Sequence, residues 1–535
     1  MSPLQTEDVY PQLIRSRAEE SPDRVTLQMV TGETMTYAQL FEEGRRWAGA
    51  YAALGVGVGD NVVQMRGVSL DYFASSLGLM LLRAVDVSIN TEYRADLLVH
   101  VLNNSRARVL VVEAQYLDRV AEVRDRVPML ETLVVLSSDT GEANGAASGF
   151  RAIPVSEFLA GSSVTAEMEP AQPWDVACIL YTSGTTGPSK GVVLPWGHLH
   201  RQARNFIPIE TLTSDDTFFL PLVTYHLGAK VTPYLAAMID GRAVVRERFS
   251  PNDFWSDIDR HGCTTTTMVG AMIPWVSAAP PTPQDHATPL RNVIMAPVPP
   301  DVDAFKERFG VRVGTAYSMT ELSNPFGSDG WTSCNANHQS CGRLKPGFEV
   351  RIVDEHDREL PDGEVGELIV RTDEPWTMNL GYYGMPEESF VAWRNGWFHT
   401  GDGFERDPDG NYYFRDRMKD AIRRRGENIS SFEVEGIVNQ HPEVVESAAV
   451  AVPSEHTEDE VMVFVRLAEG SGLRERDLLE DLVPRMPRFM VPRYIEFVEE
   501  LPKTPTDRVK KRELRARGVT DTTWDREAAG VEVPR

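Results

Sequence analysis

The sequence predicts an α/β protein: a large N-terminal domain of βαβ subdomains with a small antiparallel β region, followed by a small α+β C-terminal domain. Three observations support this class. Helical and strand patterns alternate over residues 20–137, period-two strands occupy 346–372, and the pattern restarts near Arg417–Asp420. A chain of 535 residues exceeds one compact core. We therefore expect an N-terminal domain at 1–416, a hinge at 417–420 and a C-terminal domain at 421–535.

The first part of the chain carries the alternating pattern. Tyr37–Leu54 has apolar residues at helical spacing. The short apolar runs that read as buried strands are Val62–Met65, Arg108–Val112 and Leu133–Leu136. Such alternation is typical of βαβ units around a largely parallel sheet. Ser137–Gly149, rich in Gly, Ser and Ala without periodicity, is expected to be a loop.

The middle of the chain adds a second alternating region and then changes character. Val176–Thr182 is an apolar strand that ends in a glycine-rich turn. Further alternating elements follow over 205–345, interrupted by a proline-rich loop at Ala278–Pro289. In 346–372, period-two strands are separated by polar turns, which indicates a small antiparallel region.

The C-terminal segment has a pattern of its own. Ser430 and Glu433 form a capping box that opens a helix ending near Gln440. The other expected elements are strands at Ser447–Val452, Val461–Leu467 and Tyr494–Val498, and a helix at Arg474–Leu482. These elements form an α+β domain of ordinary size.

The composition excludes several classes of protein. It is 42% hydrophobic and 25% charged, as in globular proteins, with a formal net charge of −25. An acidic surface repels phosphate backbones, which argues against nucleic acid as a partner, so an anionic ligand needs a local basic, amide-rich site. The best candidate span, Tyr72–Ile89, is interrupted by Arg83 and Asp86, so we expect no membrane segment. No secretory signal is visible, and we expect a cytoplasmic protein.

The cysteines indicate no disulfide framework, because there are only four. Cys334, His338 and Cys341 lie within eight residues and could ligate a metal. A fourth ligand is not evident, and a polar loop is the favoured interpretation.

The strongest functional motif is Tyr181–Gly191, YTSGTTGPSKG. A buried strand ends here in a turn that combines glycines, hydroxyls and one lysine. Glycines permit close approach of the backbone to a ligand, and successive N–H groups with hydroxyl donors can bind phosphate oxygens. Lys190 adds a positive charge. The turn is not a Walker A loop, because no glycine precedes the lysine and no Ser or Thr follows it.

This turn closely resembles the signature loop of the adenylate-forming superfamily, which includes acyl-CoA and aryl-CoA synthetases, peptide-synthetase adenylation domains and luciferases. Further motifs match in the same order over nearly the whole chain. Segments 415–435 and 503–511 are most similar to carnitine/crotonobetaine-CoA ligase-like members. The resemblance implies that the C-terminal domain is mobile and that ATP is a substrate.

The resemblance also implies a set of nucleotide-binding residues. The turn would hold the β- and γ-phosphates through Thr182, Ser183, Gly184, Thr185, Thr186, Gly187 and a catalytic Lys190. Tyr317 would stack on adenine, Thr320 would contact the α-phosphate, and Glu321 would bind Mg²⁺, which suits an aromatic face and a carboxylate. Asp402 would accept hydrogen bonds from both ribose hydroxyls.

The remaining motifs lie in the C-terminal segment. By resemblance, Arg417 would contact ribose or phosphate, and Lys419 would be the hinge pivot. The loop that lines the thiol tunnel of the second step would include Arg423, Gly426 and Glu427. Asp507–Arg508 stands where the family usually has Gly-Lys, so Arg508 would replace the catalytic lysine. Lys510 or Lys511 could also substitute for it.

Two further segments would border the acid pocket. Tyr225–His226 matches an aromatic–histidine pair of the family. Ile294–Pro297 stands where Gly-Gly-Ala-Pro is common, so Met295 and Ala296 are expected to reshape the pocket.

Together these residues imply ATP-dependent activation of a small polar or aromatic acid as an acyl-adenylate, followed by transfer to coenzyme A. ATP, Mg²⁺ and coenzyme A are the expected cofactors, although a carrier-protein arm presents the same thiol. An alternative is another acceptor, as in ATP-dependent diazotases that use nitrite and an aromatic amine. A more distant alternative is a non-catalytic nucleotide-binding protein. The sequence leaves the oligomeric state open.

Overall fold

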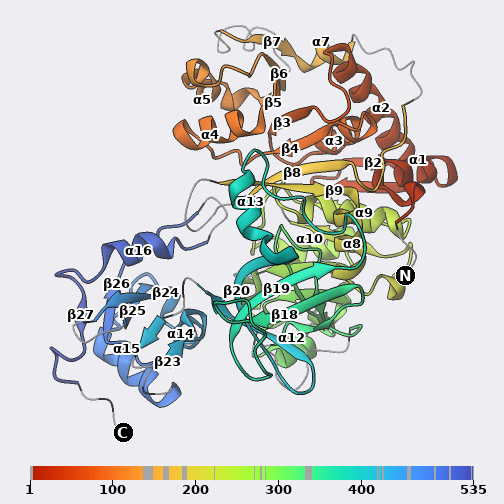
Figure 1. The fold of residues 1–535 in the computed structure, drawn as a ribbon. Coiled ribbons are helices and arrows are strands. Elements are labelled where there is room, and N and C mark those ends of the chain that lie inside the picture. Colours follow the sequence, from red (N-terminus) through yellow and green to blue (C-terminus); the bar gives the residue numbers. More distant parts are fainter. Residues whose placement is uncertain are drawn as a thin grey trace.

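The computed structural model describes most of the chain, in three sheet regions and a small C-terminal lobe (Figure 1). Outside the described part lie residues 1–3, 137–148, 161–167, 183–188, 222, 270–271, 278–279, 283–284, 300, 332–339, 419, 421, 425–426, 455–458, 487, 489, 505–507, 532 and 534–535. Among the described helices, none has the length and apolar character needed to cross a membrane.

The first sheet has the strand order β7-β6-β5-β3-β4-β8-β9. Its strands are β3 (Asn61–Met65), β4 (Val85–Ser88), β5 (Val109–Glu113), β6 (Thr132–Leu136), β7 (Arg151–Pro154), β8 (Val176–Thr182) and β9 (Lys190–Pro195). All pairs are parallel except β8 with β9. The predicted βαβ units are therefore confirmed, because parallel neighbours need crossover helices.

Two closely packed helices cover part of this sheet. α2 (Tyr37–Ala53) begins with a capping box between Thr36 and Gln39, and α3 (Leu70–Leu81) has Ser69 as its N-cap. A Cβ atom on Gly78 would lie 2.6 Å from the Cβ of Trp47, so this glycine allows the helices to approach. The other helices here are α4 (Ala95–Ser105), α5 (Leu117–Glu122) and α7 (Val155–Ala160).

The second sheet has the order β14-β13-β12-β10-β11-β1-β2 and is parallel except for β2. Its strands are β1 (Val25–Met29), β2 (Thr34–Thr36), β10 (Thr217–Leu220), β11 (Arg242–Val245), β12 (Thr265–Val269), β13 (Asn292–Ala296) and β14 (Arg312–Gly314). Its helices are α1 (Tyr10–Glu20), α8 (Trp196–Phe206), α9 (Gly228–Met238), α10 (Phe254–His261), α11 (Met272–Ser277) and α12 (Val302–Phe309). The predicted proline-rich loop contains a short 3-10 helix, Asp285–Ala287.

The third sheet is antiparallel throughout, in the order β15-β16-β17-β21-β20-β19-β18. Its strands are β15 (Ala316–Tyr317), β16 (Phe326–Gly327), β17 (Gly342–Leu344), β18 (Phe348–Val353), β19 (Gly366–Thr372), β20 (Phe398–Arg406) and β21 (Asn411–Arg417), and α13 (Pro386–Ala392) lies beside it. The sheet is larger than the antiparallel region predicted at 346–372. It adds β15, β16 and β17, which at two or three residues are too short to show a period, and the longer strands β20 and β21, which were not predicted.

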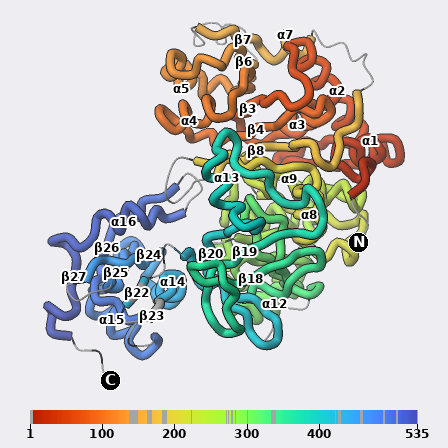
Figure 2. The backbone as a smooth tube through the Cα atoms, viewed as in Figure 1, coloured from red at the N-terminus to blue at the C-terminus, as the bar shows by residue number. Residues whose placement is uncertain are grey.

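The C-terminal lobe contains a four-stranded sheet, β24-β25-β26-β27, and a hairpin of β22 and β23. Its elements are β22 (Ile422–Arg424), β23 (Glu427–Ile429), α14 (Ser431–Val438), β24 (Val444–Pro453), β25 (Asp459–Leu467), α15 (Glu475–Leu482), β26 (Tyr494–Phe497), α16 (Lys511–Arg517) and β27 (Trp524–Asp525). Ser430 caps α14 by accepting a hydrogen bond from the Glu433 N–H at 3.2 Å, which is half of the predicted capping box. The Glu433 carboxylate pairs with Arg415 instead of returning to the cap. Figure 2 shows this lobe in blue beside the third sheet, with α16 on the side of the N-terminal domain.

A buried charge network joins the first two sheets. Lys230 of α9 donates to Asp86 Oδ2 of β4 at 2.5 Å, to Ser88 Oγ at 3.1 Å, and to the Tyr72 hydroxyl. Asp86 also accepts from Gln64 and Ser76. Tyr72 in turn donates to the Thr224 carbonyl at 3.3 Å, so the network also holds the segment that precedes α9.

Candidate active site

The β8–β9 hairpin presents the first of the predicted phosphate-binding residues. Thr182 and Lys190 are paired in register, and the Thr182 hydroxyl donates to the Lys190 carbonyl at 3.4 Å. The Lys190 ammonium lies 4.7 Å from the centre of the Tyr382 ring, within cation–π range. The predicted residues Ser183, Gly184, Thr185, Thr186 and Gly187 lie outside the described part of the chain.

Tyr382 connects Lys190 with Glu321. Its hydroxyl donates to Glu321 Oε1 at 3.2 Å, and the Asn379 amide donates to the Glu321 carbonyl at 2.9 Å. Glu321 is only 6% exposed, and burial raises the pKa of its carboxyl. Thr320, half-buried, precedes it in the same turn. Tyr382 was not predicted from the sequence, because its position depends on a backbone bridge to Val192 of β9, 190 positions earlier in the chain.

A second group of charges surrounds Asp402, which is 2% exposed. The Tyr317 hydroxyl donates to Asp402 Oδ2 at 2.5 Å, and Arg417 Nε lies 2.8 Å from Asp402 Oδ1. Burial raises the pKa of the Asp402 carboxyl, and the charge of Arg417 opposes that rise. The Tyr317 ring is itself buried and packs edge-on against Phe404 at 4.8 Å. The structure thus brings together three of the predicted nucleotide-binding residues.

The part of β20 that carries Asp402 is held by Glu367 of the neighbouring strand β19. Glu367 accepts from the Gly401 N–H at 3.0 Å and is paired with His399 Nδ1 at 2.9 Å. Asp357, Glu367 and His399 have ligand atoms within 4.8 Å of one another, a spacing compatible with a metal. However, Arg394 already pairs with both carboxylates, so we interpret this cluster as a support for the part of β20 that carries Asp402.

Arg508 extends from the C-terminal lobe toward these charges. Lost hydration and the nearby charge of Arg417 lower the pKa of its guanidinium, while Asp402 and Glu321 oppose this effect. The residue nevertheless remains exposed to solvent. Its backbone N–H donates to the Thr504 hydroxyl at 3.1 Å. Arg508 therefore belongs to the same electrostatic cluster as the predicted ATP-binding residues.

The predicted acid-pocket residues divide into two groups. Tyr225 and His226 lie just before α9 with ring centres 5.1 Å apart. Burial lowers the pKa of His226 to about 4, and the charge of Arg508 adds to this effect, so the histidine is neutral near pH 7. Met295, by contrast, is fully buried and packs in a hydrophobic core, whereas Ala296 is half-buried at the end of β13. Successive strand residues point to opposite faces, so only one of this pair can face a pocket.

The remaining predicted residues are placed only in part. Arg423 and Glu427 lie on β22 and β23, but their side chains are outside the described part, as are Lys419 and Gly426. Of the possible metal ligands, Cys334 and His338 are also outside it, and Cys341 is half-buried.

One supporting residue was missed by sequence reasoning. Gln202 of α8 donates to the Ser318 hydroxyl at 2.8 Å and to Asn324 Oδ1 at 3.2 Å, and so braces the segment that carries Tyr317 and Glu321. Neighbouring His198 is fully buried, and neither of its ring nitrogens has a hydrogen-bond partner among the described residues. Burial alone lowers the pKa of His198 to about 3.

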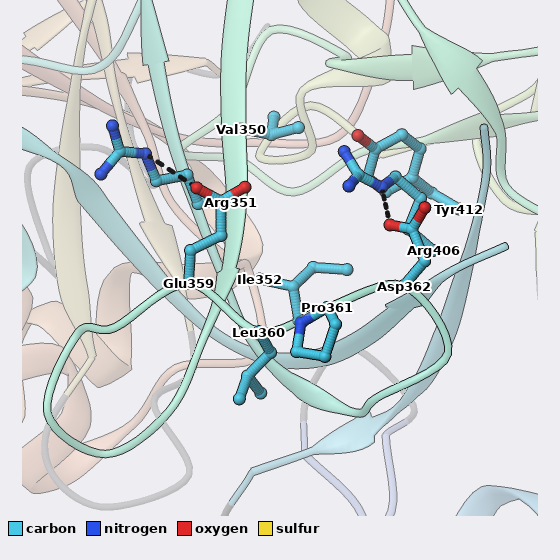
Figure 3. Close-up of a pocket in the computed structure, with 9 residues that line it drawn as sticks. All are labelled: Val350, Arg351, Ile352, Glu359, Leu360, Pro361, Asp362, Arg406 and Tyr412. Atoms are coloured by element: carbon cyan, nitrogen blue, oxygen red, sulfur yellow. Dashed lines mark hydrogen bonds and ion pairs between the residues drawn. The ribbon is translucent and has the colours of Figure 1, made fainter. Parts of the chain in front are cut away.

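A small pocket on the third sheet is separate from this site (Figure 3). It is flanked by two ion pairs, Arg406 with Asp362 and Arg351 with Glu359. Its volume of ≈ 10 Å³ is too small for more than about one water molecule, so it offers no ligand site.

Comparison with known proteins gives consistent matches over nearly the whole chain. The AMP-binding enzyme family model matches residues 14–383, and the AMP-binding enzyme C-terminal domain model matches 433–508. A crotonobetaine/carnitine–CoA ligase of Citrobacter koseri is 31% identical over 501 residues, which is 90% of this chain and 93% of the relative. The corresponding ligase of Salmonella typhi is 30% identical over 491 residues, with the same coverage.

Solved structures show the same fold. The anthranilate CoA ligase AuaEII, in complex with anthranoyl-AMP, superposes with a TM-score of 0.84 at 24% identity, covering 96% of this chain and 99% of that one. ATP-bound MatB from Rhodopseudomonas palustris gives a TM-score of 0.82 at 25% identity, covering 95% and 98%.

Proposed function

The chain belongs to the AMP-binding enzyme family and is an adenylate-forming ligase, and from this we infer that it activates a small acid with ATP and passes the acyl group to the thiol of coenzyme A. The observation that carries the proposal is the cluster of Asp402, Arg417 and Glu321, to which the C-terminal lobe adds Arg508. It combines two buried carboxylates, which can accept hydrogen bonds, with two arginines that can pair with phosphates.

In the first step, a carboxylate oxygen of the acid attacks the α-phosphorus of ATP, and pyrophosphate leaves. Positioning and charge neutralisation do most of the work in such a transfer. Arg508 stabilises the oxyanions around the α-phosphorus, while Lys190 and the glycine-rich turn hold the outer phosphates. Asp402 binds the ribose hydroxyls in place of its present partner Tyr317 or together with it.

Mg²⁺ fits the same site. Glu321 is a buried carboxylate, and burial raises its pKa because it disfavours the charged form. A divalent ion there would keep it ionised. When bound, the ion supplies positive charge to the phosphates of ATP.

In the second step, we propose that the C-terminal lobe rotates about Lys419. Rotation withdraws Arg508 and brings the loop of Arg423, Gly426 and Glu427 to the adenylate, so one site serves two reactions. The thiol sulfur attacks the acyl carbon, and AMP leaves.

The acid is proposed to be small and polar or aromatic. The relatives named above include ligases for crotonobetaine or carnitine and for anthranilate. In this chain the pair Tyr225–His226 offers an aromatic ring and a neutral imidazole, which suit such an acid better than a long alkyl chain.

A second candidate is adenylation followed by transfer to an acceptor other than a thiol, such as nitrite activation for an aromatic amine. The motivating departure is Arg508, because a planar guanidinium presents its donors in a fixed fork, unlike the lysine ammonium that is usual in the family.

The test is a pyrophosphate-release screen over a library of acids that includes nitrite, with and without coenzyme A. The proposal predicts release with at least one carboxylic acid and a thioester when coenzyme A is present. Release that needs nitrite and an aminoaryl acid, without coenzyme A, would establish the second candidate. Tight ATP binding with no release for any acid would leave a nucleotide-binding protein.

A further inference from the structure

The strand that carries Asp402 departs from the regular sheet ladder at that residue. β20 pairs with β19 on both sides of Leu368, but the register shifts next to it. At this bulge Leu368 alone lies opposite three residues of β20, which are Thr400, Gly401 and Asp402. Bulges are over-represented next to active sites, because the extra residues re-aim a side chain and locally disrupt the ladder. The backbone groups of the bulge must then be satisfied by other hydrogen-bond partners.

Thr400 satisfies two of these backbone groups through one hydroxyl. The residue is buried, and its Oγ1 donates to the Leu368 carbonyl at 2.8 Å and accepts from the Asp402 N–H at 3.0 Å. The hydroxyl therefore links the backbone of Asp402 to β19 where the ladder is interrupted. A hydroxyl can make both bonds because it offers one donor and two acceptor lone pairs, whereas a valine of similar shape offers neither.

Gly401 completes the bulge. Its φ of +69° is a left-handed conformation that favours glycine. Its N–H donates to Glu367 Oε1 at 3.0 Å, and its carbonyl accepts from the Met418 N–H at 2.9 Å. Contacts to β19 on one side and to the end of β21 on the other therefore fix the direction in which the Asp402 side chain leaves the strand.

The bulge also contacts the arginine that pairs with Asp402. Arg417 Nη1 donates to the Thr400 carbonyl at 3.4 Å, while Arg417 Nε lies 2.8 Å from Asp402 Oδ1. Thr400 thus touches both members of the ion pair, Asp402 through its hydroxyl and Arg417 through its carbonyl.

The direction of the Asp402 carboxylate matters for the role proposed for it. The two hydroxyls of a ribose are neighbours on one ring, so a carboxylate held at one angle can accept from both at once. A carboxylate that is free to turn forms the two bonds together less often, because each bond then has to be oriented separately.

We propose that Thr400 is a positioning residue for nucleotide recognition. Its hydroxyl holds Asp402 in the direction that lets the carboxylate accept from both ribose hydroxyls, and it thereby sets the preference for a ribonucleotide over a 2′-deoxyribonucleotide. Thr400 acts through Asp402 and does not itself contact the nucleotide. This inference rests on the ATP-binding part of the proposed function.

The experiment measures the affinities of the full-length protein for ATP and for 2′-deoxy-ATP by calorimetry, with Mg²⁺ present and no acid added. Wild type should bind ATP about tenfold or more tightly than 2′-deoxy-ATP, because the analogue lacks one hydrogen bond to a carboxylate. Thr400→Val should lower this ratio to about threefold or less, by weakening ATP while leaving 2′-deoxy-ATP within about twofold. Thr400→Ser keeps the hydroxyl, so its ratio should stay within about twofold of wild type.

A double variant tests whether the effect passes through Asp402. Asp402→Asn should by itself remove most of the preference for ATP. Adding Thr400→Val to it should then change the ATP affinity by less than about twofold, because both substitutions act on the same hydrogen bonds.

Thr266→Val is the matched control. Thr266 is also a buried strand threonine, and its hydroxyl donates to the Phe219 carbonyl at 3.2 Å in the second sheet. The variant therefore loses a buried hydroxyl of the same kind without affecting the bulge of β20. Its affinities for both nucleotides should stay within about twofold of wild type.

A wild-type ratio in Thr400→Val would overturn the assignment, as would equal weakening of both nucleotides, because a general loss of structure does not depend on one ribose hydroxyl. A wild-type protein that binds the two nucleotides equally would overturn it as well. If Thr400→Val does not fold, Gly401→Ala strains the same bulge without removing a hydroxyl. It should lower the ratio by about threefold or more, and an unchanged ratio would contradict the proposal.

ATP–pyrophosphate exchange separates this inference from the proposed function. If wild type binds no ATP and no acid supports exchange, the proposed function fails. If exchange occurs and the ratio is the same in wild type and Thr400→Val, only the assignment of Thr400 is removed.

Discussion

Two regions of this molecule bury charged side chains, and they differ in how far those side chains are paired within the protein. Between the first two sheets, Lys230 meets Asp86, Ser88 and Tyr72, and Asp86 receives further hydrogen bonds from Gln64 and Ser76. In the candidate site, Glu321 is also buried, but among the described residues no cation lies within ion-pair distance of it, and Tyr382 is the side chain that donates to its carboxylate. A buried network whose polar groups are all paired within the protein stabilises the fold. A buried polar group that lacks such a partner can instead bind a group of a ligand. Substitutions in the Lys230–Asp86 network should therefore change stability, and substitutions in the candidate site should change activity.

The largest expected effect is on stability. Lys230→Met leaves Asp86 as an uncompensated charge that is fully buried, which should lower the free energy of unfolding by about 3–5 kcal/mol. Denaturant unfolding followed by circular dichroism measures this loss. The double variant Lys230→Met with Asp86→Leu should recover most of it, because neither charge remains. A double variant as unstable as the single one would show that packing, not charge, is responsible.

A smaller change, now in ATP binding, should follow from Asp402→Asn. The asparagine side chain keeps the shape of the aspartate. It removes the negative charge that faces Arg417 and one of the two acceptor oxygens for the ribose. A hydrogen bond to a charged group is worth about 1.5–3 kcal/mol, so the KM for ATP should rise about 10- to 150-fold. The KM for the acid should change much less. If both constants rise equally, Asp402 supports the whole site rather than the nucleotide.

The sequence predicted the elements that carry local patterns. The boundaries of β8, Val176–Thr182, follow from a buried apolar run that ends at a glycine-rich turn. The cap of α14 by Ser430 likewise depends on residues three positions apart. Local chemistry was sufficient in both cases.

The contacts that complete the site depend on distant partners and could not be predicted in this way. Lys230 and Asp86 are 144 residues apart, and a lysine in a helix is expected to be solvated. Tyr382 and Gln202 reach Glu321 and Ser318 only because the fold brings the segment before α13 and helix α8 next to the residues that follow β15. Met295 was assigned to the acid pocket from a motif, but its side chain packs in the core.

The next effect concerns pH and the buried His198. Its pKa is lowered to about 3 in the folded protein, whereas an unfolded histidine titrates near 6.5. The unfolded state therefore binds an extra proton below about pH 6.5, and stability falls as the pH drops toward 4. His198→Leu should reduce the pH dependence of the unfolding free energy by up to about 1.4 kcal/mol per pH unit in this range. Unfolding curves at pH 7, 6, 5 and 4 measure the slope. An unchanged slope would mean that His198 is not buried in neutral form.

The smallest effect is expected for Tyr382→Phe. The variant loses one hydrogen bond to Glu321 but keeps the ring beneath Lys190. A loss of about 0.5–1.5 kcal/mol corresponds to a decrease of about 2- to 12-fold in the rate of pyrophosphate release. Tyr383→Phe, at the neighbouring residue, serves as the control. Equal decreases in both variants would argue against a specific Tyr382–Glu321 contact.

The most direct test of the account uses Arg508→Ala with an acid that supports activity. Acid-dependent ATP–pyrophosphate exchange should fall by about 10²- to 10³-fold, as when one oxyanion-stabilising group is removed. Transfer from a supplied acyl-adenylate to its acceptor should stay within about twofold of wild type, and the melting temperature should not change, because Arg508 is exposed. Equal loss of both half-reactions, or undiminished exchange, would contradict the claim that Arg508 completes the site for adenylation alone.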